Sequence, residues 1–186
     1  MMTPKLFMII IGCTPAGRHT EQHDVFFGIG NSLSDLLPDM EKFWPGTKLH
    51  IDSWRTVTEV NGYKVKIVDS QSNPATATQR LFFLNLGGYK PGDMEEYHYK
   101  LLCVAGDKGD AIKQAKQTAF YKHTGFKGAT SHIDDKYGID VDDIYEIQDI
   151  LPASLKTKYD IVLEKSHGEV AGDELHIGYV KLSSLV

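Results

Sequence analysis

The chain has 186 residues, of which 41% are hydrophobic and 24% are charged, and its formal net charge is −5 at pH 7. This length is enough for one ordinary domain or two very small ones, and the composition is typical of a soluble globular protein. The acidic balance argues against a surface that neutralises nucleic-acid phosphates, and no apolar run approaches the roughly 18 residues that span a membrane. We therefore expect neither nucleic acid nor a membrane as a partner.

The first predicted element is a strand over residues 5–12, an apolar run rich in isoleucine. The same run followed by Cys13 also resembles the end of a lipoprotein signal, but its six apolar residues are fewer than the roughly 7–15 of a signal core. A similar run returns at residues 80–88, in the middle of the chain, where a signal would not stand. We therefore interpret the first run as a strand of the fold and expect the protein to be cytoplasmic.

A second strand is predicted over residues 24–30. It is followed by a helix whose apolar residues recur at three- and four-residue steps over residues 33–44. Ser32 with Asp35 three residues later is an N-cap signature. Pro38 lies inside the helical pattern and lacks the N–H for a bond to an earlier carbonyl, so we expect a bend there.

The remaining elements of the first half are a strand over residues 49–54 and a hairpin over residues 56–68. The Asn61-Gly62 pair, set between alternating residues, is the strongest hairpin signal in the chain. The first half thus reads β-β-α-β-β. Residues 70–79 are rich in Ser, Thr, Asn and Pro without periodicity, and we predict that they form a linker.

The second half of the sequence repeats the first. A shift of 75 positions aligns about forty residues, with seven identical pairs where average composition predicts roughly two or three. After a seven-residue insertion the alignment resumes at a shift of 82, where His50-Ile51-Asp52 falls on His132-Ile133-Asp134 and Tyr63 falls on Tyr145. The identical pairs of the first alignment are Leu6/Leu81, Phe7/Phe82, Gly12/Gly87, Gly17/Gly92, Glu21/Glu96, His23/His98 and Asp35/Asp110.

We therefore predict a tandem duplication, with a first repeat over residues 1–69 and a second over residues 80–152. The helix of the second repeat is expected from about Asp107, its N-cap, to Tyr121, and its hairpin turn at Asp142-Asp143. Residues 153–186 lie outside the repeat, and their two alternating segments predict a C-terminal β-hairpin that covers a sheet edge. The expected fold class is α+β, with two β-β-α-β-β units related by a pseudo-two-fold axis.

The stretches HDVFFGIGNSLSDLLPDMEKFW, LHIDSW and VNGYKVKIVD together resemble a small family filed as a domain of unknown function, number fifteen forty-three. The family occurs in one or two copies in short, mostly bacterial proteins. The resemblance is close over about residues 5–69, looser over residues 80–152, and does not include the tail. It implies a duplicated soluble domain, and it carries no activity, ligand or catalytic residue that could be transferred to this chain.

The strongest chemical pattern combines histidines and carboxylates at two-residue spacing, which places them on one face of a strand. If the strands that carry them are neighbours, two imidazoles and one or two carboxylates converge. Such a set suits Zn²⁺, Fe²⁺ or Mn²⁺ and leaves a position for water. The candidate ligands are His23, His50, Asp52, His98, His132 and Asp134, with Glu21 and Glu96 as a second tier.

Two other interpretations of these residues stay open. Without a metal, an imidazole beside a carboxylate could act as a general base. The interpretation that we favour from the sequence is structural, because a histidine paired with a carboxylate on the next strand fixes the register and satisfies buried polar groups. The sequence thus establishes no cofactor, and a divalent transition metal is its one candidate.

Two further features give weaker hypotheses. Glycines before a helix N-terminus can cradle an anion, so Gly28, Gly30 and Ser32 are candidate anion-binding residues, although acidic residues in the same turn would repel a phosphate. Cys13 and Cys103 are far apart in sequence and lack metal-binding spacing, so we expect reduced, buried thiols.

Three functional hypotheses follow. The favoured one is a non-catalytic binding or scaffold module that associates with itself, as a homodimer, through sheet edges or exposed aromatic side chains. The second is a small metal-dependent hydrolase or redox enzyme that uses the repeated His, Asp and Glu sets. The third is a sensor with a pocket between the repeats for a small-molecule ligand that the sequence does not identify.

Overall fold

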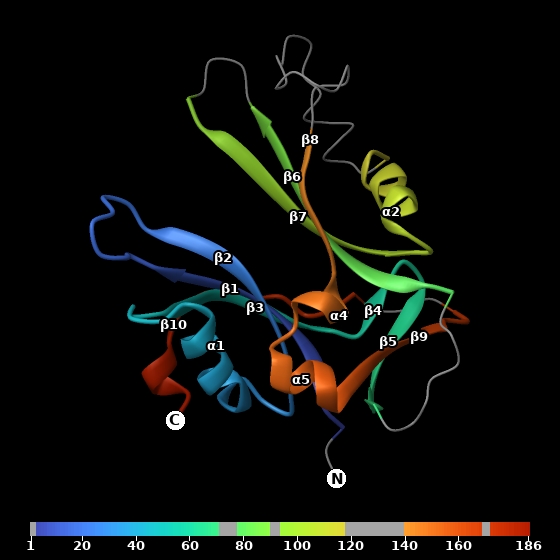
Figure 1. The fold of residues 1–186 in the computed structure, drawn as a ribbon, viewed down its shortest axis with the longest axis horizontal. Helices are drawn as coiled ribbons and strands as arrows, with labels where there is room; N and C mark the ends of the chain where they lie inside the picture. Colours follow the sequence, from blue (N-terminus) through green and yellow to red (C-terminus); the bar gives the residue numbers. More distant parts are fainter. Residues whose placement is uncertain (1–2, 71–77, 90–93, 118–139, 169–171) are drawn as a thin grey trace. The chain divides into compact units, whose positions relative to one another are not determined.

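The computed structural model describes residues 3–70, 78–89, 94–117, 140–168 and 172–186. Within these ranges the chain mixes short helices with three antiparallel sheets, which confirms the predicted α+β class (Figure 1). None of the described helices is both long and apolar enough to cross a membrane.

The chain divides into two compact units: unit 1 comprises residues 1–75 and 150–186, and unit 2 comprises residues 76–149. The main sheet of unit 1 has four antiparallel strands in the order β10-β3-β1-β2, so β1 lies between two partners. Its strands are β1 Lys5–Cys13, β2 Gln22–Gly30, β3 His50–Val57 and β10 His176–Lys181.

A second sheet of unit 1 has the order β4-β5-β9 and begins at the predicted hairpin. Asn61 and Gly62 have φ angles of 50° and 76°, the left-handed values that a two-residue hairpin turn requires, so this prediction is confirmed. A short helix, α5 (Ala153–Lys158), leads into the last strand of this sheet. The strands are β4 Glu59–Val60, β5 Tyr63–Asp69 and β9 Tyr159–Lys165.

The core of unit 1 lies between one face of the main sheet and three short helical segments: η1 (Ser34–Leu36), α1 (Leu37–Phe43) and η3 (Leu182–Ser184). Alternate residues of β1 point into this core, so the residues between them, ending with Gly12, stand on the opposite face. The buried core residues are Phe7, Ile9, Ile11, Phe26, Leu36, Met40, Ile51 and Leu182.

The start of α1 differs from the sequence prediction. The α-helix begins at Leu37, so Pro38 lies in its first turn, where a missing N–H leaves no hydrogen bond unmade, and the expected bend is wrong. Ser32 does not cap the helical segment either. The carboxylate of Asp35 instead accepts hydrogen bonds from the backbone N–H groups of Asn31 and Ser32, at 2.7 and 3.2 Å.

Unit 2 contains one sheet, in the order β7-β6-β8, with the helix α2 (Lys108–Ala115) packed against it through Ala111 and Ala115. The predicted cap is confirmed, because the Asp107 side chain accepts a hydrogen bond of 2.9 Å from the N–H of Asp110. The strands are β6 Arg80–Tyr89, β7 Glu96–Ala105 and β8 Asp140–Glu146, and the short helix α4 (Ile147–Ile150) follows β8.

The predicted C-terminal hairpin is wrong. The alternating segments do form strands, but β9 pairs with β5 and β10 pairs with β3, in two different sheets. Alternation predicts that a segment is a strand and says nothing about its partner. Here β3 and β5 each accept one of the last strands along an edge that would otherwise be open.

The predicted alignment of the two halves also needs correction after the helix. Asp142-Asp143 lies inside β8 and is not a turn, and Tyr145 pairs with Phe83 in the way that Arg55 pairs with Met8. The strand pairing around Gly87 therefore matches that around Gly12 at a shift of 90, not 82, and in this register Tyr145 falls on Arg55 and not on Tyr63. The segment His132–Asp134, on which the earlier alignment rested, lies outside the described residues, as does the predicted end of the second helix.

Candidate metal centre

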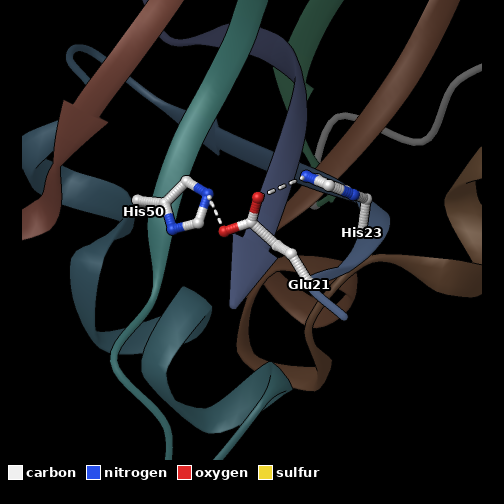
Figure 2. A group of neighbouring side chains, drawn as sticks. All are labelled: Glu21, His23 and His50. Atoms are coloured by element: carbon white, nitrogen blue, oxygen red, sulfur yellow. Dashed lines mark ion pairs between the residues drawn. The ribbon is translucent and has the colours of Figure 1, made fainter. Parts of the chain in front are cut away.

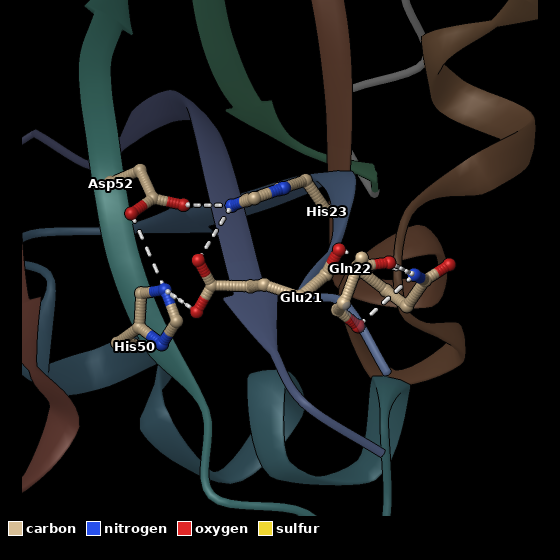
Figure 3. Close-up of polar contacts among 6 residues, drawn as sticks. Glu21, Gln22, His23, His50 and Asp52 are labelled. Carbon is tan, nitrogen blue, oxygen red and sulfur yellow. Dashed lines mark hydrogen bonds and ion pairs between the residues drawn. The ribbon is translucent and has the colours of Figure 1, made fainter. Parts of the chain in front are cut away.

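Four polar side chains of unit 1 converge at one end of its main sheet: Glu21 directly before β2, His23 in β2, and His50 and Asp52 at the start of β3 (Figure 3). His50 Nε2 lies 3.2 Å from Glu21 Oε1 and 3.3 Å from Asp52 Oδ1. His23 Nε2 lies 3.4 Å from Glu21 Oε2 and 3.1 Å from Asp52 Oδ2. Each carboxylate thus lies between the same two nitrogen atoms, as Figure 2 shows for Glu21.

Gly12 makes this convergence sterically feasible. It lies on the central strand β1 and pairs with His23 on one side and with His50 on the other, so both histidines flank it on one face of the sheet. A Cβ atom at Gly12 would stand 2.6 Å from His50 Nε2 and 3.0 Å from Asp52 Oδ2. The side chains therefore occupy the space that any other residue at this position would need.

A β-bulge in β3 directs the fourth side chain into the cluster. Ser53 pairs with Ile10 and Ile51 pairs with Ile11, which leaves Asp52 as the extra residue of the bulged strand. Bulges bend a strand and change the direction of a side chain. At this bulge Asp52 reaches both histidines, including His23 two strands away.

The cluster is buried on one side and open on the other. The His50 side chain is 5% exposed, whereas those of His23 and Glu21 are 43% and 46% exposed. Buried Nε2 of His50 and Oδ2 of Asp52 lie within ion-pair distance of opposite groups, yet neither has a hydrogen bond of acceptable geometry. Buried polar atoms without partners are rare in native proteins and commonly mark an ion or water that belongs there.

The donor set fits a divalent metal ion. Three potential ligand atoms, one each from Glu21, His23 and His50, lie within 4.8 Å of one another. Among the described residues, this is the set of His, Cys, Asp or Glu side chains that lies close enough to hold one metal ion. Asp52 adds a second carboxylate on the opposite side of the nitrogen atoms. Two imidazoles with two carboxylates can hold Zn²⁺, Mn²⁺ or Fe²⁺, and the open side leaves room for a water molecule.

Unit 2 places related residues at the corresponding positions. Gly87 on β6 pairs with His98 on β7 and with Asp140 on β8, and the strand pair has a bulge between Asn85 and Leu86. An Asp thus stands at the register position that His50 holds in unit 1.

The contacts in unit 2 differ from those in unit 1. His98 Nδ1 lies 3.1 Å from Asp142 Oδ2, and its other nitrogen, Nε2, lies 3.9 Å from Glu96 Oε2. His98 Nδ1 also lies 3.3 Å from the side-chain nitrogen of Asn85. His98 thus faces its two carboxylates with different ring nitrogens, and within the described residues these three groups do not meet the distance condition that Glu21, His23 and His50 meet.

Four of the predicted residues lie together in unit 1, namely Glu21, His23, His50 and Asp52, and two more, Glu96 and His98, lie together in unit 2. Asp142 was not among the predicted residues, because the alignment matched His50-Ile51-Asp52 to the identical triplet at residues 132–134. The alternation of Asp140-Val141-Asp142 could have indicated a strand that carries two carboxylates on one face. His132 and Asp134 lie outside the described residues.

The glycine-rich turn at residues 28–32 does not have the free N–H groups that the anion-site hypothesis requires. The N–H groups of Asn31 and Ser32, which a bound anion would need, already donate to Asp35, and the bond from Asn31 holds the pKa of this carboxyl below its usual value. A Cβ at Gly28 or at Gly30 would stand 2.9 or 3.2 Å from the Leu36 side chain. These glycines therefore serve close packing of the helical segment on β2.

The two cysteines are free and buried, as predicted. The Cys103 thiol donates a hydrogen bond of 3.1 Å to the Gln114 side-chain oxygen, and burial raises the pKa of Cys103 to about 11. A neutral thiol of this kind is a poor nucleophile and a poor metal ligand near pH 7.

Residues 18–67 match the family described as Domain of Unknown Function (DUF1543). The matched segment contains Glu21, His23, His50 and Asp52, and it ends before β9 and β10. Among solved structures, the crystal structure of a protein Il1583 from Idiomarina loihiensis is similar, with a TM-score of 0.65 and 23% sequence identity. The match covers 96% of this chain and 97% of that chain, and at this identity it shows a common fold alone. No curated protein matches the sequence.

Proposed function

We propose that unit 1 is a metal-binding module that holds one divalent transition-metal ion through Glu21, His23, His50 and Asp52. The observation that carries the proposal is the environment of His50 Nε2. This atom is buried and makes no hydrogen bond, although it lies 3.2 and 3.3 Å from oxygen atoms of two carboxylates. A cation bound at this position would coordinate this nitrogen.

The separations in the cluster support the same proposal. Ligands bound to one cation at bond lengths of about 2.0–2.2 Å lie about 3.0–3.5 Å from their neighbours in the coordination shell. The four nitrogen–oxygen distances of the cluster run from 3.1 to 3.4 Å. Small shifts of the exposed Glu21 side chain would bring one of its oxygen atoms into the same shell.

A purely structural role accounts for less of the arrangement. One Nε2–H group donates along one direction, but each histidine faces two carboxylates with the same nitrogen atom. Burial of His50 between them without a hydrogen bond would leave polar atoms unsatisfied, which costs about 1–3 kcal/mol for each group. A bound cation satisfies both imidazoles and both carboxylates at once.

A zinc titration tests the proposal. We expect metal-free protein to bind one Zn²⁺ per chain by calorimetry, and Mn²⁺ more weakly. The variants His50→Gln and His23→Gln should weaken Zn²⁺ binding by roughly 100-fold or more. His176→Gln is the matched control, because this histidine stacks on Trp54 outside the cluster. Equal affinity in all four proteins would refute the proposal.

The open side of the cluster favours a second candidate, a metal-dependent hydrolase. With Glu21 and His23 nearly half exposed, a metal at this position would keep water within its coordination shell. A bound divalent metal lowers the pKa of such a water, and an adjacent carboxylate can accept its proton. Glu21→Gln in a protein that still binds metal would separate the two roles, since a hydrolase would lose turnover and a binding module would not change.

We also infer that the two units derive from one duplicated module. The inference is supported by the equivalent ladders around Gly12 and Gly87 and by the bulge at the same position in β3 and β8. The pairing of His23 and His98 with these glycines supports it further. Asp140 at the position of His50 indicates that the second unit has changed its ligand chemistry.

A further inference from the structure

A row of paired residues continues from the metal centre across the whole main sheet. His23, Gly12 and His50 lie side by side on β2, β1 and β3, and Lys181 on the edge strand β10 pairs with His50. Directly paired residues in antiparallel strands place their side chains on the same face. The preceding pair, Val180 with Ile51, packs on the core, so Lys181 stands on the opposite face, where the metal centre lies.

Tyr179 lies on the same side of β10. Its ring centroid is 4.6 Å from that of His50, and the two planes are inclined by 31°. A β-bulge between Ile177 and Val180 accommodates this position, and Tyr179 remains 63% exposed. The aromatic ring thus covers the buried histidine on the side of β10.

Lys181 supplies a positive charge that the described part of the chain does not neutralise, since its exposed side chain has no ion pair there. The two carboxylates of the centre balance the charge of a divalent metal ion. The Lys181 ammonium group is therefore the net positive charge that remains for a ligand, and the metal's open coordination position can accept one oxygen atom of that ligand. Together they favour an anion.

The geometry points to a small oxyanion, a phosphate or carboxylate group, that binds the metal on its open side and is held by Lys181 beside the Tyr179 ring. Lys181 stands two strands, about 10 Å, from Gly12, a span that a lysine side chain and a metal-bound oxyanion can bridge together. This inference rests on the proposed metal site and assigns its ligand class. It also gives β10, which lies outside the family match, a part in recognition.

The test uses full-length protein loaded with one Co²⁺ per chain, whose visible absorption reports ligands that enter the metal's coordination shell. Inorganic phosphate is titrated in one arm and acetate in the other, so that the two anion classes are distinguished. We expect at least one of them to change the spectrum saturably. Lys181→Gln should lower the affinity for that anion by roughly tenfold, because one charge-assisted hydrogen bond is lost. It should not change the affinity for Co²⁺.

Lys165→Gln is the matched control, because this exposed lysine ends β9 in the other sheet. It should leave anion and Co²⁺ binding unchanged. Two results would overturn the inference but not the proposed metal site. One is a Co²⁺ spectrum that responds to neither anion, and the other is equal anion affinity in the wild type and in Lys181→Gln. Failure of the wild-type protein to bind Co²⁺ would overturn both proposals.

Discussion

At the scale of the residue, the candidate centre depends on a position that has no side chain. The histidines and carboxylates could be predicted because their two-residue spacing places each pair on one face of a strand. Gly12 carried no predicted role and was only one of the identical residues of the repeat. The structure shows why a glycine stands there: His50, His23 and Asp52 fill the space beside its Cα atom. The role of a glycine between two strands that carry histidines can be recognised only when the strand order is known.

Gly12→Ala tests this role. The new Cβ would lie 2.6 Å from His50 Nε2 and 2.9 Å from His23 Cδ2, so the histidines must move apart. We expect Zn²⁺ affinity, measured by calorimetry, to fall by about 10- to 100-fold, with the far-ultraviolet circular dichroism preserved. Gly172→Ala is the control, because nothing lies within 4 Å of its Cβ position. Wild-type Zn²⁺ affinity in Gly12→Ala would show that the histidines do not need this space.

At the scale of the element, features that depend on a few neighbouring residues were predicted correctly, whereas the pairing of strands far apart in the sequence was not. The Asn61-Gly62 turn and the Asp107 cap depend on a few neighbouring residues, and both were predicted correctly. The partners of β9 and β10 depend on which sheet edges the rest of the fold leaves open, and the predicted hairpin was wrong. Asp140 pairs with Gly87 as His50 pairs with Gly12, and this depends on the pairing of β8 with β6, which residue identity does not reveal.

The cap of α2 gives a prediction at this scale. Asp107→Ala removes the side-chain acceptor for the Asp110 N–H, so we expect the free energy of unfolding to fall by about 1 kcal/mol. Asp107→Asn keeps an acceptor oxygen at the same position and should retain most of the stability. Urea denaturation followed by circular dichroism measures both. A loss in Asp107→Asn as large as that in Asp107→Ala would mean that charge, and not the capping bond, supplies the stabilisation.

At the scale of the whole molecule, two units with separate cores carry related clusters that differ in chemistry. Unit 1 places two imidazoles between two carboxylates, whereas in unit 2 His98 contacts its carboxylates with opposite ring nitrogens. The sequence predicted a similar set in each half, because it aligned His132 with His50, and it left open whether the two sets have the same role. The ladder of unit 2 puts Asp140 there instead. We therefore expect one transition-metal ion per chain and not two.

The most direct test of this account is the metal content of untagged protein, purified without added metal and measured by mass spectrometry beside two variants. We expect about one transition-metal ion per chain in the wild type and in His98→Gln, and a fraction of that amount in His50→Gln, because His50 supplies the buried ligand of unit 1. Circular dichroism would confirm that both variants are folded. No metal in the wild type, or an undiminished content in His50→Gln, would contradict the account.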